Sequence, residues 1–113
     1  MILFDKRENK IMISKQDTGV FVVEFEDGEG YEVPADGVQA IFTAKTRDGT
    51  TEIIRKTFTV EDGEVEIELD SDDTDQNIGN YLWDLRLKWE SNGRVYTPML
   101  PGQLEIMRVV GDV

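Results

Sequence analysis

Cysteine and histidine are both absent from the 113 residues of this chain. Their absence excludes disulfides, thiolate metal sites, cysteine nucleophiles and any acid–base or triad chemistry that depends on an imidazole. The lack of disulfides fits synthesis in a reducing cytosol. No carboxylate pair or serine–lysine arrangement with a catalytic pattern is recognisable, so we assign no catalytic residue and expect a protein that is not an enzyme.

Basic residues are scarce. Twelve lysines and arginines face 24 acidic residues, which gives a formal net charge of −12. Such a charge repels phosphate backbones and anionic lipid, so we expect neither a nucleic acid nor a membrane as partner. Apolar runs long enough to cross a bilayer, about 18 residues, are also absent. The opening Met1–Phe4 is too short for the core of a signal peptide, and its charged residues follow it.

Short segments of alternating polar and apolar residues make up most of the chain. Turn residues recur at about every tenth position, and no stretch longer than one turn has a helical pattern. We therefore predict an all-β protein, an antiparallel β-sandwich of about seven to nine strands, with a closed barrel as the alternative. Residues 1–9 form an N-terminal lead-in segment, and residues 10–113 form the single domain.

Alternation predicts the inward face of several strands. Val38, Ala40, Phe42 and Ala44 are expected on one face, whereas the acids that alternate with apolar residues over 64–70 are expected to face solvent. Lys56 is the exception on the strand predicted over 52–59, and we expect it near an edge.

Turn chemistry predicts how some of these strands connect. Turns are expected at residues 27–30 and 47–50, the second of them a hairpin loop, and residues 98–102 break the strand pattern. A turn at residues 16–19 is expected to close a first hairpin between strands that begin at Lys10 and Val20. Residues 31–34 are expected to be extended and to lie at an edge, because Pro34 cannot donate a hydrogen bond to a sheet. The polar stretch 70–77 is long enough to cross between two sheets, and we predict a single helical turn there with Ser71 as its N-cap.

The most apolar strand is predicted after this crossover. Alternate positions from Tyr81 to Trp89 are large and apolar. The spacing Asn77-x-Gly79-x-Tyr81-x-Trp83 is that of the tyrosine corner, which opens strand F of immunoglobulin-like sandwiches. We expect the Tyr81 hydroxyl to bond to the backbone of the preceding turn and Trp83 to pack in the core. Both are fold-defining residues under this interpretation.

An acidic cluster offers a candidate metal site. Calcium takes several carboxylate oxygens, and the cluster carries four carboxylates: Asp70, Asp72, Asp73 and Asp75. The glycine and glutamate positions of an EF-hand are missing, and capping of the crossover accounts for the same residues. No metal or other cofactor is therefore assigned.

Two apolar features are candidates for protein–protein contact. The first is the N-terminal segment Met1, Ile2, Leu3 and Phe4, which is suited to pairing with an unpaired sheet edge. The second is Trp89, near the end of its strand, because tryptophan is enriched at interfaces. A frayed terminus and core packing are the respective alternatives.

A resemblance to a known family rests on four short motifs. They are Asp17-Thr18-Gly19, the Gly79-x-Tyr81-x-Trp83-Asp84-Leu85 strand, a hairpin into Thr97-Pro98, and Gly102-x-Leu104-x-Ile106. Together they resemble the immunoglobulin-like domains of bacteriophage tail and baseplate proteins, including the N-terminal domain of baseplate upper proteins of Gram-positive phages and prophages. The resemblance spans about Lys10 to Val110.

The resemblance implies a structural module of a phage or prophage tail or baseplate particle. Its partners would be other tail or baseplate proteins or further copies of itself, with no cofactor and no catalytic residue. It would be synthesised in the bacterial cytoplasm and reside in the virion. The receptor-facing and trimerising regions of a full baseplate protein have no counterpart here. The alternative is a carbohydrate- or calcium-dependent binding domain of a bacterial surface protein.

Overall fold

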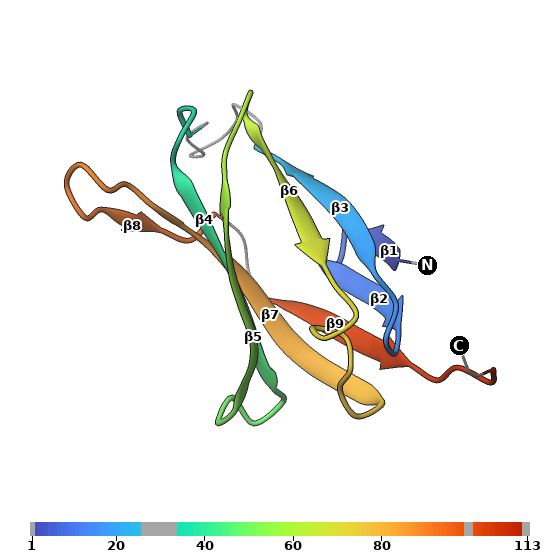
Figure 1. Cartoon of the computed structure of the whole chain (residues 1–113). Coiled ribbons are helices and arrows are strands. Elements are labelled where there is room, and N and C mark those ends of the chain that lie inside the picture. Colours follow the sequence, from blue (N-terminus) through green and yellow to red (C-terminus); the bar gives the residue numbers. More distant parts are fainter. Residues whose placement is uncertain (1, 26–33, 99–100, 112–113) are drawn as a thin grey trace.

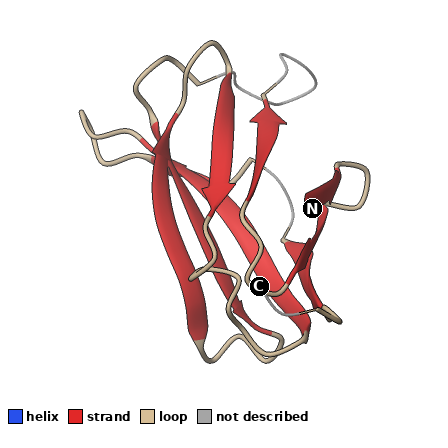
Figure 2. Cartoon of the chain, turned by 45° about the vertical axis from the view of Figure 1, so that its right-hand side comes forward, coloured by secondary structure: helices blue, strands red, loops and turns tan. Residues whose placement is uncertain are grey.

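The chain is all-β in the computed structural model, which describes residues 2–25, 34–98 and 101–111. Within these residues there are nine strands and no helix (Figures 1 and 2). No helix long and apolar enough to span a membrane occurs in the same part of the chain. The strands are β1 (Ile2–Asp5), β2 (Lys10–Ser14), β3 (Gly19–Glu24), β4 (Gln39–Thr46), β5 (Glu52–Thr59), β6 (Glu64–Leu69), β7 (Gly79–Lys88), β8 (Val95–Tyr96) and β9 (Gly102–Met107).

The main sheet contains seven strands in the order β1-β2-β9-β7-β4-β5, with β8 paired to β7. Strand β4 runs along one side of β7, whereas β9 and the short β8 pair with Gly79–Trp83 and Leu87–Lys88 of β7. Strands β2 and β9 are parallel, so the sheet is mixed and the prediction of a purely antiparallel structure was wrong. Parallel neighbours need a long connection, and here nearly the whole chain lies between the two strands.

The second sheet consists of β3 and β6, which pair antiparallel from Gly19↔Leu69 to Glu24↔Glu64. The predicted hairpin across residues 16–19 is therefore wrong, because β2 and β3 belong to different sheets. The turn keeps a local bond from the Asp17 amide to the Ser14 carbonyl at 3.0 Å, but the Gln16 amide donates to the Thr74 carbonyl at 3.3 Å. This contact with the distant crossover directs the chain out of the main sheet. The first hairpin is instead β1–β2.

The core lies between the two sheets. On β7 the predicted apolar face is buried, and Trp83, Leu85 and Leu87 are all less than 2% exposed. On β6 the same alternation buries Val65, Ile67 and Leu69 and leaves the three glutamates exposed. Aromatic rings join the sheets at the centre, where the Trp83 ring stacks on Phe42 at 5.5 Å and meets Phe21 edge-on at 6.1 Å.

The crossover between β6 and β7 consists of turns, and the Thr74 amide donates to the Asp70 carbonyl at 3.2 Å, which is the bond of a single helical turn. The predicted N-cap, Ser71, was wrong. Asp70 takes the capping role, since its side chain accepts the Asp73 amide and the Asp73 side chain accepts the Asp70 amide, each at 2.9 Å. This reciprocal pair of hydrogen bonds satisfies the backbone amides of both residues, which have no backbone partner in the turn. Thr74 is fully buried and donates its hydroxyl to the Asp17 carbonyl at 2.7 Å, which ties the crossover to the β2–β3 turn.

The expected hydrogen bond of Tyr81 is present. Its hydroxyl donates to the Asn77 carbonyl at 2.6 Å, and Gly79 between them has φ 144°, which favours glycine. We predict that Tyr81→Phe lowers the free energy of unfolding by about 0.5–1.5 kcal/mol, the net value of one intramolecular hydrogen bond. Urea denaturation followed by circular dichroism measures the loss. Tyr96→Phe, which removes a tyrosine hydroxyl from the same sheet away from the crossover, is the control, and an equal loss in both variants would contradict the prediction.

The β4–β5 hairpin is closed as predicted, with Gly49 at φ 74°. One oxygen of Asp48 accepts the hydroxyls of Thr46 at 2.6 Å and Thr50 at 2.8 Å, and the Thr50 amide at 3.1 Å. These bonds, led by the one from Thr46, lower the pKa of Asp48 to about 2. The carboxylate is fully exposed, so only the direction of its effect on stability follows.

Asp48 predicts a local pH dependence. Because its pKa in the folded protein lies below the value of 3.8 for an unperturbed aspartate, its stabilising effect is present above about pH 4 and is lost as the pH falls toward 2. We expect Asp48→Asn to melt below the wild type at pH 6, and the difference in Tm to shrink at pH 2.5. Asp72→Asn, at an exposed acid in another loop, is the control. A difference for Asp48→Asn that stays constant with pH would refute this role.

Candidate interaction surfaces

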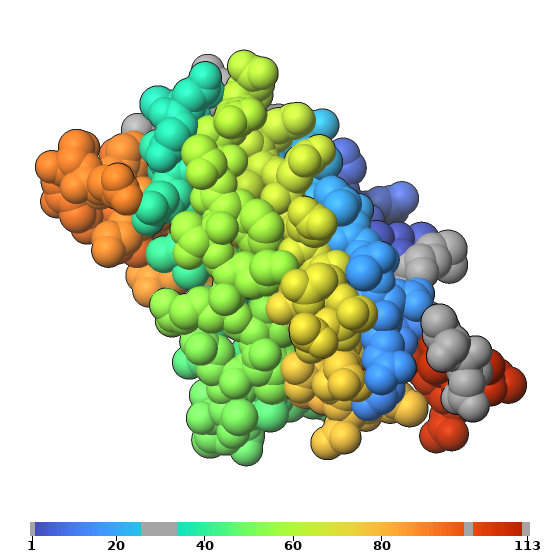
Figure 3. Space-filling model, in the orientation of Figure 1, coloured from blue at the N-terminus to red at the C-terminus, as the bar shows by residue number. Residues whose placement is uncertain are grey.

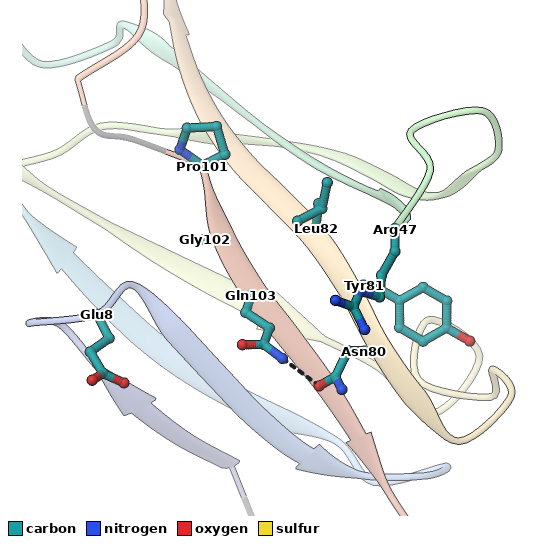
Figure 4. Close-up of a pocket in the computed structure, with 8 residues that line it drawn as sticks. All are labelled: Glu8, Arg47, Asn80, Tyr81, Leu82, Pro101, Gly102 and Gln103. Atoms are coloured by element: carbon teal, nitrogen blue, oxygen red, sulfur yellow. Dashed lines mark hydrogen bonds between the residues drawn. The ribbon is translucent and has the colours of Figure 1, made fainter.

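A hollow of about 280 Å³ lies on the outer face of the main sheet, over β7 and β9. Figure 4 shows its floor, formed by the two strands, with Glu8 and Arg47 reaching it from separate turns on opposite sides. The Gln103 amide donates to the Asn80 side chain at 2.6 Å across the floor. Its lining consists of Glu8, Arg47, Asn80, Tyr81, Leu82, Pro101, Gly102 and Gln103.

The chemistry of this hollow suits a polar group from a partner better than a small-molecule substrate. Its volume falls just below the range of about 300–1,000 Å³ that ligand pockets occupy. The two amides on the floor bind each other, while Leu82 is 41% exposed beside them. A protruding side chain of another protein would find an arginine, a carboxylate and an apolar contact here, but no paired catalytic groups.

The acidic cluster surrounds a lysine. The Lys56 ammonium on β5 donates to Asp73 at 2.8 Å and to the Glu68 carbonyl at 2.9 Å, and it lies 3.7 Å from Asp70. Desolvation opposes the charged form, but the hydrogen bond and charge of Asp73, with Asp70 and Glu68, raise the pKa of Lys56. The pKa of Asp70 is lowered, first by the Asp73 amide and also by Lys56.

The Lys56 ammonium pairs with two of the four carboxylates predicted as calcium ligands, Asp70 and Asp73. The remaining acids are dispersed, since Asp75 pairs with Lys15 at 3.4 Å and Asp72 is exposed. No group of three or more acidic side chains is arranged to hold a metal ion within the described residues. The cluster instead links β5 of the main sheet to the crossover that leaves β6. Lys56 was predicted to lie near an edge, and β5 is the last strand of the sheet.

The two fold-defining residues lie in the core. Trp83 is 1% exposed, and its indole N–H donates to the Asn9 carbonyl at 2.8 Å. Tyr81 is 9% exposed, and burial raises the pKa of its hydroxyl. Neither ring is available to a ligand, so both serve to hold the two sheets together.

The N-terminal segment belongs to the main sheet as its edge strand β1. Ile2 and Phe4 pack against the core, and the Phe4 ring lies 4.8 Å from that of Phe21. Leu3 points the other way and is 43% exposed. Met1 lies outside the described residues. Of the segment predicted as an interface, Leu3 and the outer side of β1 remain open to a partner.

Trp89 lies at the base of the β7–β8 hairpin, which we define as residues 86–97. It is half-buried against the core, and the Arg94 guanidinium stacks on its ring at 4.6 Å. The turn is closed by bonds from the Trp89 amide to the Arg94 carbonyl and from the Gly93 amide to the Trp89 carbonyl, both at 2.9 Å. Tryptophan and arginine thus occur together on a hairpin that projects from one end of the molecule (Figure 1).

A further surface has no counterpart in the sequence interpretation. The outer face of β3–β6, here called the acidic face, presents Val20 at 49% and Val22 at 38% exposure beside a row of glutamates on β6. The sequence shows the alternation of acidic and apolar residues on β6, and the acidic side was predicted to face solvent. The sequence pattern did not predict that exposed valines would lie next to these glutamates, because their position depends on the pairing of β3 with β6.

Comparison with known proteins identifies no relative of this chain. No family model matches the chain, and neither the curated proteins nor the solved structures contain a match. The fold defines the class of the protein, which is an all-β chain with a mixed seven-stranded sheet and a two-stranded sheet around one core.

Proposed function

We propose that the chain is an immunoglobulin-like, non-enzymatic assembly module of a bacteriophage or prophage tail or baseplate particle, and that it acts through protein–protein contacts. The observation that carries the immunoglobulin-like assignment is the start of β7. A polar crossover leads from the smaller sheet into this strand, and the Tyr81 hydroxyl then bonds back to Asn77. That is the arrangement of a tyrosine corner at the beginning of strand F.

The strand order supports the same proposal. Strands β3 and β6 correspond to B and E of an immunoglobulin sandwich, and β4, β7 and β9 to C, F and G, with β5 beside β4 in the place of C′. The chain departs from that pattern in having only two strands in its smaller sheet. It also has a core tryptophan, Trp83, on the strand where antibody domains place a cysteine.

The distribution of exposed groups favours assembly over catalysis or ligand capture. Five of the exposed large apolar residues lie on strands: Leu3, Val20, Val22, Leu82 and Val95. The others, Ile78, Val109 and Val110, lie outside the strands. Interfaces between proteins combine such apolar positions with polar surroundings. The aromatic residues that the structure describes are buried in the core or packed against it, and Lys56 pairs with Asp70 and Asp73 of the acidic cluster.

The test is to locate the protein in its natural host. After induction of the prophage or infection, an antibody against the chain should detect it in purified tail particles at a fixed ratio to a major tail protein. The matched control is the same preparation from a strain in which the gene is deleted. Detection only in the cell-wall fraction, together with a Tm that rises with added calcium, would favour the surface-binding alternative and refute the proposal.

A further inference from the structure

Charge is divided unevenly between the two sheets. Strands β3 and β6 carry four acidic residues, Glu24, Glu64, Glu66 and Glu68, and no basic one. All four are exposed. The register places Glu66 beside Val22 and Glu68 beside Val20, so each exposed valine adjoins a carboxylate. The acidic face is therefore a narrow apolar strip bordered by negative charge, and it lies open on the front of the molecule in Figure 3.

The β7–β8 hairpin has the opposite character. It carries Arg86, Lys88 and Arg94 against the single acid Glu90, in a chain whose net charge is −12. Lys88 lies directly across from Val95, which is 46% exposed, so the hairpin also presents a cation next to an apolar side chain. Arg86 is exposed and its Nε donates to the Thr97 hydroxyl at 3.2 Å. This is the chemical complement of the acidic face.

We propose that the β7–β8 hairpin of one copy docks on the acidic face of a second copy of this chain. The valines of the face would meet Val95, while Glu64 and Glu66 would meet Arg86 and Lys88. Apolar contact supplies the affinity, and the opposite charges fix the register and exclude wrong partners. The contact deepens the proposed function, on which it rests, by naming the partner as the chain itself.

The two surfaces do not overlap on one copy. In Figures 1 and 3 the hairpin projects at the left end, whereas β3 and β6 lie together on the front and right. A copy can therefore use both at once, which makes the contact head-to-tail. Contacts of this kind generate closed rings or open filaments, the forms that a tail or baseplate component requires.

Two charge-reversal variants test the contact, each with one surface blocked. Arg86→Glu/Lys88→Glu blocks the hairpin. Glu64→Lys/Glu66→Lys blocks the acidic face, and it spares Glu68 because that residue lies next to Lys56. Each variant should weaken self-association by about tenfold or more, since like charges then face each other. Sedimentation equilibrium across micromolar to millimolar concentrations measures association, and circular dichroism establishes that each variant is folded.

Matched controls reverse the same number of charges elsewhere. Lys45→Glu/Arg108→Glu changes exposed cations outside the hairpin and the hollow; Lys45 lies opposite Leu82, far along β7 from Lys88. Glu52→Lys/Asp72→Lys changes exposed acids outside β3, β6 and the hollow. Both controls should associate as the wild type does. Loss of association in a control would show that net charge, and not the proposed contact, governs the assembly, and would overturn the inference.

Mixing the two blocked variants gives the decisive result. Each retains the surface that the other lacks, and the two reversed surfaces are themselves opposite in charge, so an equimolar mixture of two otherwise monomeric proteins should recover self-association. A mixture that stays monomeric, or wild-type protein that is monomeric at every concentration, would overturn the inference. A wild type that is monomeric alone yet present in tail particles would overturn this contact and leave the proposed function standing. A protein that self-associates through these surfaces but is absent from tail particles would overturn the proposed function and leave the contact standing.

Discussion

Trp83→Ala is expected to lower the free energy of unfolding by about 3–5 kcal/mol, the cost of removing a large buried aromatic side chain. Trp83 is 1% exposed, and its ring contacts those of Phe42, Phe21 and Phe4 at centroid distances of 5.5, 6.1 and 6.1 Å. Its removal leaves a cavity between the two sheets and an aromatic cluster without its centre. Urea denaturation followed by far-ultraviolet circular dichroism measures the loss.

Two comparisons isolate the cause of this loss. Trp83→Phe keeps a ring in the core but removes the bond to the Asn9 carbonyl, and should cost about 1–2 kcal/mol. Trp89→Ala removes a half-buried tryptophan and should cost less than half of the Trp83→Ala value. Equal destabilisation by Trp83→Ala and Trp89→Ala would mean that Trp83 is not the centre of the core.

Gly102→Ala should be nearly as damaging, at about 3 kcal/mol, the upper end of what overpacking a filled site costs. A Cβ at this position would overlap the Asn9 carbonyl oxygen and come within 2.5 Å of the Trp83 Nε1. The backbone oxygen cannot withdraw easily, because it accepts both the Trp83 indole at 2.8 Å and the Gln103 amide at 3.2 Å. The added methyl group therefore forces the β1–β2 turn away from β9.

Gly111→Ala is the matched control for this substitution. A Cβ there meets no atom within 4 Å, so the change should stay within about 0.5 kcal/mol. Thermal and urea denaturation of the two variants give the comparison. A Gly102→Ala protein as stable as the wild type would show that β9 and the β1–β2 turn are not packed as closely as described.

Much of the secondary structure could be predicted from local patterns. Alternation placed Ala40, Phe42 and Ala44 of β4 on one face with Val38, which precedes the strand, and all four are buried. The hairpin at Gly49, the strand break between Thr97 and Gly102, and the Tyr81 bond to Asn77 also followed from residues close together in sequence. The turns at 27–30 and the extended piece at 31–34 lie mostly outside the described residues.

The Ser71 N-cap was a local error, because Asp70 takes that role. The larger errors concern contacts between distant residues. The turn at residues 16–19 has ordinary hairpin chemistry, yet its direction depends on the Thr74 carbonyl. Lys56 was recognised as an exception on an apolar strand, but its three oxygen partners come from another sheet and a crossover. For the interaction surfaces, the hairpin tryptophan was identified from its residue type, whereas the valines of the acidic face were not.

By itself, the sequence determined an all-β chain, the inward face of most strands and the exclusion of cysteine- and histidine-based chemistry, because side-chain alternation and residue type are local properties. Only the tertiary structure decided that β2 runs parallel to β9, that β3 pairs with β6, and that an acidic face and a basic hairpin occupy different parts of one molecule. A strand edge accepts any partner strand through the same backbone hydrogen bonds, so the choice among partners rests on how the whole core packs.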